Sequence, residues 1–194
     1  MINWLLFNIH YINLFYALIG LAILALSTAL AVDYFYNKQK FYRKFVAQYV
    51  WYLITMTIFG GVATTLLYSE VFSFVPCSLC WLQRVALYSQ LLLLLTAIKL
   101  KDRVYFPRYG ITLSAFGLLV ALYQYLYQAL PTTLLDSGLL PCLADGSADC
   151  AKTVMEVFGF VTFPFLSGVL FIFLITLYLH VIRSKKSLTT TIDS

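Results

Sequence analysis

Charged residues are scarce in this 194-residue chain: Asp, Glu, Lys and Arg make up 11% of it, whereas hydrophobic residues make up 62%. Soluble proteins average about 25% charged residues, and a chain with so few could not cover its own exterior with polar groups. The composition therefore excludes an ordinary soluble domain and favours a membrane protein. At about 20 apolar residues per crossing, the length allows four or five transmembrane helices and leaves no room for a second globular domain.

Long uncharged apolar runs fill most of the sequence, and the third of them is interrupted only by Arg84. They predict five transmembrane helices, at about 11–32, 45–69, 81–98, 109–130 and 158–182. Sheet is not expected, because outer-membrane barrels show alternating segments of only about 10 residues. We therefore expect an all-α integral membrane protein, with residues 1–186 as one polytopic domain and a disordered cytosolic tail at 187–194. The segment 151–163 is predicted to be a short interfacial helix.

The basic residues are concentrated on one side of this topology. Eleven of the 13 Lys and Arg residues fall in the loops 33–44 and 99–108 and in the tail after 182, whereas Arg84 and Lys152 lie on the other side. The positive-inside rule then places the N-terminus outside and the C-terminus in the cytosol. The net charge of +5 is explained by topology, so nucleic acid is not expected as a partner.

The first apolar run ends in Ala29-Leu30-Ala31, which is similar to a signal-peptide cleavage site. Cleavage is not expected, because the stretch 1–10 has no positive charge and a secretory orientation would carry the basic loop 33–44 across the membrane. We expect the first helix to be retained.

All four cysteines fall on the outer side, where disulfides persist: Cys77 and Cys80 in one loop, Cys142 and Cys150 in the next. Two structural disulfides are one interpretation, and a zinc site with four thiolates is another, although an oxidising exterior disfavours zinc. The two-residue gap between Cys77 and Cys80 closes a very small ring, which constrains the unfolded chain little. This pair therefore favours a redox centre.

The surroundings of Cys80 support that interpretation. Pro76 ends the preceding element, and the apolar run resumes at Trp81, so Cys80 is predicted at the N-terminus of the third helix, where the helix dipole stabilises a thiolate. Arg84 lies four residues further, on the same helix face. A cation in a membrane helix is a functional-site candidate, and the alternative is an arginine whose side chain extends to the lipid headgroups.

The run Pro76–Leu87, with Cys77-Ser78-Leu79-Cys80 followed by Arg84, resembles the signature of the bacterial disulfide bond formation protein DsbB and its Gram-positive-type relatives called BdbC. The segment Gly159–Ser167 is similar to the region after the second cysteine pair of that family. The resemblance covers about 45–182, and the seven-residue gap between Cys142 and Cys150 is nearer the BdbC-like form.

The resemblance implies a four-helix transmembrane bundle in the bacterial cytoplasmic (inner) membrane and a thiol:quinone oxidoreductase activity. It implies that a soluble thioredoxin-fold thiol oxidase, similar to DsbA, is the partner and attacks Cys142. Cys150 then exchanges with Cys77, and Cys80 passes electrons to ubiquinone or menaquinone beside Arg84. That relay keeps the bacterial periplasm oxidising. No metal is expected, because the cysteines face an oxidising exterior.

The chain departs from the family pattern in two places. The helix at 11–32 is additional to the usual four, and the fourth run reads Tyr123-Gln124-Tyr125 where the family often has a histidine near the quinone. Two alternatives stay open. One is a relay similar to vitamin K epoxide reductase, in which the C-x-x-C pair comes after the loop pair. The other is a non-enzymatic membrane protein with two inert disulfides.

Overall fold

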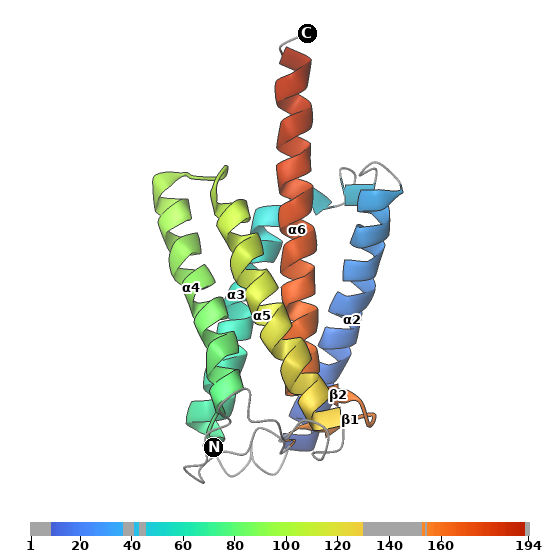
Figure 1. Cartoon of the computed structure of the whole chain (residues 1–194), viewed down its shortest axis with the longest axis vertical. Helices are drawn as coiled ribbons and strands as arrows, with labels where there is room; N and C mark the ends of the chain where they lie inside the picture. The colour runs from blue at the N-terminus through green and yellow to red at the C-terminus, as the bar shows by residue number, and fades with distance from the viewer. Residues whose placement is uncertain (1–8, 37–40, 43–45, 130–152, 154, 193–194) are drawn as a thin grey trace.

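The computed structural model describes residues 9–36, 41–42, 46–129, 153 and 155–192, with side chains up to Ser184. Its five long helices are each long and apolar enough to cross a membrane, and together they make an all-α membrane protein (Figure 1). They are α2 (Ile9–Phe35), α3 (Val50–Leu66), α4 (Ser78–Leu100), α5 (Phe106–Ala129) and α6 (Phe163–Ile192). A π-helical turn, η2 (Leu67–Val71), extends α3.

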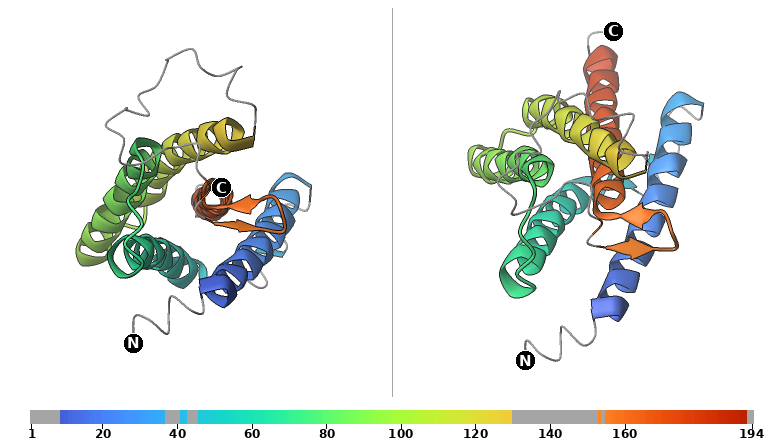
Figure 2. Two further views of the ribbon diagram at one scale, coloured as in Figure 1. Left: turned by 90° about the horizontal axis from the view of Figure 1, so that it is seen from below. Right: turned by 60° about the horizontal axis from the view of Figure 1, so that its bottom comes forward.

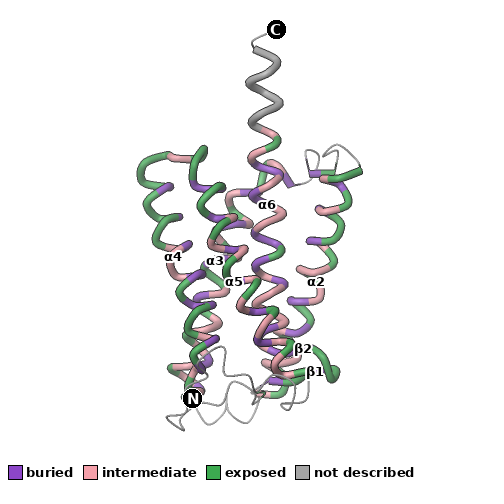
Figure 3. Tube along the Cα trace, in the orientation of Figure 1, coloured by how far each residue is buried: buried purple, intermediate pink, exposed green. Residues whose placement is uncertain are grey.

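Helix α6 is the central helix of the bundle. It contacts α2, α3 and α5, while α4 packs on α3 and α5. Viewed along the bundle, α6 lies between α2 on one side and the other three helices on the other (Figure 2). The most apolar window of α6 is 44% buried and that of α2 only 22%. Accordingly, buried positions recur along α6 (Figure 3), and α2 presents much of its surface outward.

Two glycines let α5 approach α6 closely. Gly110 and Gly117 are seven residues apart and share one helix face. A Cβ at Gly110 would lie 2.6 Å from the ring of Tyr178, and one at Gly117 would overlap the ring of Phe171. Both rings are fully buried. Small residues at such crossings are typical of membrane helix pairs.

The segment before α6 differs from the expectation. The predicted interfacial helix at 151–163 is wrong where the structure describes it: β1 (Glu156–Val157) pairs antiparallel with β2 (Val161–Thr162). Phe158 and Gly159 at the turn have φ of 56° and 76°, a left-handed conformation that a right-handed helix cannot contain. Helix α6 therefore begins at Phe163 rather than at 158, with Pro164 in its first turn.

The other end of α6 also differs from the expectation. The helix continues to Ile192, through most of the tail for which disorder is expected. No proline or glycine follows Gly168 in the sequence, so no helix-breaking residue ends α6 at 182.

The bundle has two polar ends. We call the end with the hairpin and the starts of α4 and α6 the cysteine end, because Cys77 caps α4 there, and the opposite end, where α2 ends, the far end (Figure 1). At the far end, both carboxylate oxygens of Asp33 accept hydrogen bonds from backbone N–H groups, those of Phe41 and Tyr42, each at 2.9 Å. The His180 ring stacks on Tyr42 and hydrogen-bonds through Nε2 to the Leu30 carbonyl at 2.9 Å. These contacts join α2 to α6.

Candidate redox site

The two cysteines of the C-x-x-C motif lie at the start of α4. Cys77 is the N-cap residue in an extended conformation, and its Sγ accepts a hydrogen bond from the Cys80 N–H at 3.4 Å. Both cysteines are free thiols, and their Sγ atoms are 3.0 Å apart. The structure thus places Cys80 in the first helical turn, as predicted, and holds the two sulfurs where a disulfide between them needs little movement.

The two thiols have different electrostatic surroundings. The hydrogen bond between Cys77 and Cys80 and the burial of Cys77 raise the pKa of the Cys77 thiol above its usual value. Cys80 instead has its sulfur at the N-terminal turn of α4, where the helix dipole favours negative charge. When the pair is reduced, Cys77 is therefore the sulfur that keeps its proton, and Cys80 is the better placed nucleophile.

Arg84 is buried within the protein. Its side chain is only 9% exposed, which does not fit an arginine that extends to the lipid headgroups. Nη2 donates a hydrogen bond to the Thr65 carbonyl at 2.9 Å, and the guanidinium lies 5.3 Å from the ring centre of Trp81. Neither of these partners carries a negative charge. A buried cation held by neutral groups can still attract an anion or a polarised carbonyl.

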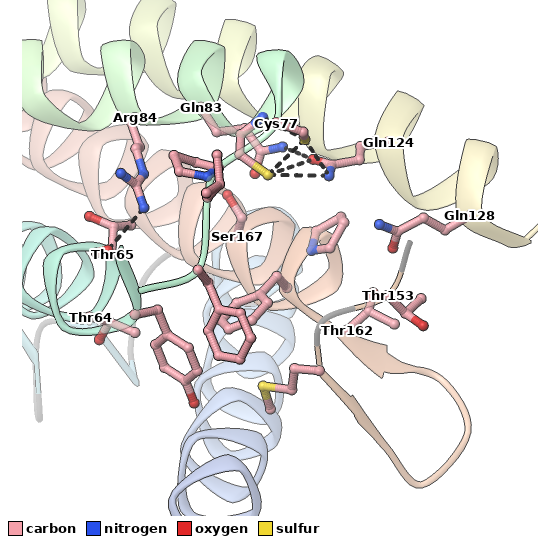
Figure 4. Close-up of a pocket in the computed structure, with 18 of the residues that line it drawn as sticks. Thr64, Thr65, Cys77, Gln83, Arg84, Gln124, Gln128, Thr153, Thr162 and Ser167 are labelled. Carbon is pink, nitrogen blue, oxygen red and sulfur yellow. Dashed lines mark hydrogen bonds between the residues drawn. The ribbon is translucent and has the colours of Figure 1, made fainter. Parts of the chain in front are cut away.

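A cavity of about 160 Å³ connects these groups, several times the space that one water needs. Cys77, Cys80 and Arg84 all line it, as do residues of α3, η2, α5, the hairpin and α6 (Figure 4). Its apolar lining comes from Tyr68, Phe74, Val75, Pro76, Leu87, Met155, Phe163 and Pro164. The structure therefore brings the three predicted site residues of this end around one largely apolar space.

The same cavity has polar residues that the sequence interpretation misses. Gln83 and Gln124 are buried and hydrogen-bonded to each other. Gln124 appears in the sequence interpretation only as a departure from a family histidine. The signal that could find both is that an amide inside a transmembrane helix is rare and expensive unless it has a role.

Thr162 is the third residue missed. It is 7% exposed, it lines the cavity, and its Oγ1 has no hydrogen-bond partner among the described residues. An unpaired buried hydroxyl costs free energy. A ligand with an acceptor oxygen would remove that cost. No sequence pattern indicates Thr162, because its position depends on the unpredicted hairpin.

Comparison with known proteins decides the family. Residues 47–181 match the model of the family described as disulfide bond formation protein DsbB. The chain belongs to the DsbB family. It is 39% identical over 144 residues to the SPbeta prophage-derived disulfide bond formation protein B of Bacillus subtilis, covering 74% of this chain and 92% of that protein. It is also 35% identical over 133 residues to a probable disulfide formation protein of Oceanobacillus iheyensis, covering 69% and 88%.

A third relative is the disulfide bond formation protein C of Bacillus subtilis, 30% identical over 137 residues, covering 71% of this chain and 91% of that protein. No solved structure matches the chain. The protein is therefore a multi-pass bacterial membrane protein of disulfide bond formation. Helix α2 ends before residue 47, so it is additional to the part of the chain that matches the family.

The second cysteine pair of the DsbB-family pattern, Cys142 and Cys150, lies outside the described residues. Its expected exchange with Cys77 is therefore a proposal. The segment that contains it connects α5 to the hairpin. Both of those elements contribute lining to the cavity.

Proposed function

We propose that this DsbB-family protein is a membrane thiol:quinone oxidoreductase, which reoxidises a soluble thioredoxin-fold thiol oxidase outside the cytosol and passes the electrons to membrane quinone. The observation that carries the proposal is the convergence of Cys77, Cys80 and the buried Arg84 on one apolar cavity. The family match favours this function over a relay similar to vitamin K epoxide reductase. The buried Arg84 and the cavity beside Cys77 and Cys80 favour it over a protein with two inert disulfides.

The cavity fits a quinone headgroup on chemical grounds. A quinone is a flat apolar ring with two carbonyl acceptors, and the cavity combines apolar walls with polar donors that include the Arg84 guanidinium and the unpartnered Thr162 hydroxyl. Ubiquinone or menaquinone, when bound, would supply the acceptor for two electrons and two protons. Arg84 would stabilise negative charge that develops beside Cys80, in an environment where such interactions are stronger than in water.

The order of thiol exchange is the one that the DsbB family implies for the four cysteines. A thiolate of the partner attacks Cys142 of a Cys142–Cys150 disulfide and releases Cys150, which attacks Cys77 of the Cys77–Cys80 disulfide and releases Cys80 as thiolate. The partner's second thiol then displaces Cys142, leaving the partner oxidised. Cys142 next attacks Cys150, which restores their disulfide and releases Cys77. The net change is one disulfide gained by the partner and one lost between Cys77 and Cys80.

The decisive experiment measures ubiquinone and menaquinone reduction by the purified protein with a reduced thioredoxin-fold oxidase. We expect the quinone absorbance to fall, with one partner disulfide formed for each quinone reduced. Partner oxidation without quinone reduction, or no reaction with either quinone, would contradict the proposal.

The proposal also needs the cysteine end on the outer side of the membrane. The distribution of eleven against two cations supports that orientation. In intact cells, a membrane-impermeant thiol reagent should label a variant that keeps only Cys142. Labelling of that variant only when the reagent is supplied from the cytosolic side would reverse the topology.

A further inference from the structure

Gln83 and Gln124 form a pair of amides beside the sulfurs of Cys77 and Cys80. We propose that Gln83 fixes the orientation of the Gln124 amide, so that the Gln124 N–H₂ group donates to both sulfurs and stabilises the reduced pair over the disulfide. Gln124 is thus a residue that tunes the redox equilibrium, and Gln83 is its positioning residue. The inference rests on the proposed function only in taking Cys77 and Cys80 as a redox pair.

The geometry comes from two neighbouring helices. Gln83 on α4 donates from Nε2 to Oε1 of Gln124 on α5, at 2.6 Å. Nε2 of Gln124 then lies 3.4 Å from the Sγ of Cys77 and 3.4 Å from the Sγ of Cys80 (Figure 4). Gln124 is 3% exposed, so bulk water does not compete for these contacts.

The chemistry of a primary amide makes the orientation matter. One end of the group accepts hydrogen bonds and the other end donates them. Because the Gln83 N–H binds the Gln124 oxygen at 2.6 Å, the Gln124 N–H₂ group is the end directed at both sulfurs, while the oxygen is only a distant acceptor for the Cys80 thiol, at 3.9 Å. A Gln124 amide turned the other way would set two N–H groups against each other, unless Gln83 turned as well.

The amide donors distinguish the two redox states of the pair. Hydrogen bonds to an ionised acceptor are about twice as strong as those between neutral groups. A thiolate present in the reduced pair therefore gains more from Gln124 than the uncharged sulfurs of a disulfide do. Stabilising the reduced form makes a disulfide more oxidising, which suits a pair that must accept electrons from Cys150.

A merely structural role of Gln83 and Gln124 would give a different experimental result. Two amides buried between α4 and α5 also satisfy each other's polar groups, and their loss would then lower stability without moving the redox equilibrium. The equilibrium of the Cys77–Cys80 pair is thus the measurement that separates the two roles.

The experiment uses the full chain in detergent, depleted of quinone, with Cys142→Ala and Cys150→Ala so that one disulfide remains. In glutathione buffers, the Cys77–Cys80 disulfide and two glutathione thiols exchange with the dithiol and one glutathione disulfide, and alkylation traps the mixture. We expect Gln124→Met to lower the equilibrium constant for reduction about tenfold, equivalent to one strong hydrogen bond. Gln83→Met should lower it about threefold, since Gln124 can still donate part of the time.

The double variant tests the positioning role. If Gln83 acts through Gln124, then Gln83→Met should add nothing to Gln124→Met. Gln90→Met is the matched control, because Gln90 is a fully buried amide on the same helix whose Oε1 binds Ser114 and Tyr178. We expect that control to leave the constant unchanged.

Two results would overturn the inference. If the constant of Gln124→Met stays within about twofold of the parent, as in the Gln90→Met control, the amide does not tune the pair. If the effects of Gln83→Met and Gln124→Met add fully, Gln83 does not act through Gln124. Should Gln124→Met fail to fold, Gln124→Asn, whose shorter side chain draws the amide away from the sulfurs, must shift the constant in the same direction. The assay contains neither quinone nor partner, so its result is independent of the quinone test.

Discussion

The two polar ends of the bundle use buried polar groups in different ways. At the far end, the side chains of Asp33 and His180 bind backbone groups: two N–H groups after α2 for Asp33, and a carbonyl of α2 for His180. At the cysteine end, Gln83, Gln124 and the sulfurs bind one another beside a cavity. The far end thus fixes chain segments in place, whereas the cysteine end presents its polar groups to a shared space.

The difference shows how to separate structure from chemistry in a membrane helix, where any buried polar group is costly. Asp33 is fully buried, and its two carboxylate oxygens accept hydrogen bonds from the backbone N–H groups of Phe41 and Tyr42. These bonds help to hold α2 against the bundle. Thr162 is almost as buried and keeps its hydroxyl unpartnered among the described residues. The first pattern predicts an effect on stability when the residue is changed. The second, at a residue that lines the cavity, predicts an effect on ligand binding.

The largest expected effect belongs to the cysteines of the cavity. Cys80→Ser should reduce quinone-coupled oxidation of the partner to the uncatalysed rate, because no disulfide with Cys77 can form and accept electrons. Cys77→Ser should do the same. Turnover is measured from quinone absorbance with reduced partner. Normal turnover by purified Cys80→Ser would show that the cavity is not the redox centre.

Arg84→Ala should have the next largest effect. Loss of the buried cation removes a charged donor from the cavity, and we expect the KM for quinone to rise by about tenfold or more. Exchange between the two cysteine pairs should continue, because it needs only thiolates and access. Arg84→Lys keeps the charge and should be intermediate. An unchanged KM in Arg84→Ala would mean that the buried guanidinium is part of the structure only.

The far end should respond in the opposite way. Asp33→Asn removes one of two acceptors and turns an amide N–H₂ toward a backbone N–H, so we expect a loss of about 1–3 kcal/mol in unfolding free energy. Quinone turnover at a temperature where the variant stays folded should equal that of the parent. Denaturant or thermal unfolding in detergent measures the first quantity. A loss of quinone turnover without a loss of stability would contradict the structural role that we assign to Asp33 at the far end.

The sequence predicts the parts of this protein that depend on local composition. Five apolar runs are enough to predict five helices, and Pro76 with the restart at Trp81 is enough to place Cys80 at a helix start. The hairpin is not predictable from the same periodicity, because its strands are two residues long and its turn depends on left-handed backbone at Phe158 and Gly159.

The cavity depends on contacts that no local pattern encodes. Gln83 and Gln124 are 41 residues apart, and only the packing of α4 on α5 brings their amides together. Arg84 is predictable as a candidate because a cation in an apolar run is conspicuous, whereas a single threonine near a helix start is not. Thr162 therefore gives the most demanding test of the site.

The smallest expected effect is that of Thr162→Val. Valine has nearly the shape of threonine without the hydroxyl, so the cavity keeps its form and loses one neutral donor. A neutral hydrogen bond contributes about 0.5–1.5 kcal/mol, and we therefore expect a two- to tenfold rise (about 1.4 kcal/mol per factor of ten) in the KM for quinone. Because the unpartnered hydroxyl is itself costly to bury, the variant should be as stable as the parent or more so. Thr162→Ser keeps the hydroxyl and should bind quinone like the parent. Equal KM values for the valine and serine variants would show that Thr162 does not contact the quinone, which would leave Arg84 as the donor proposed for it.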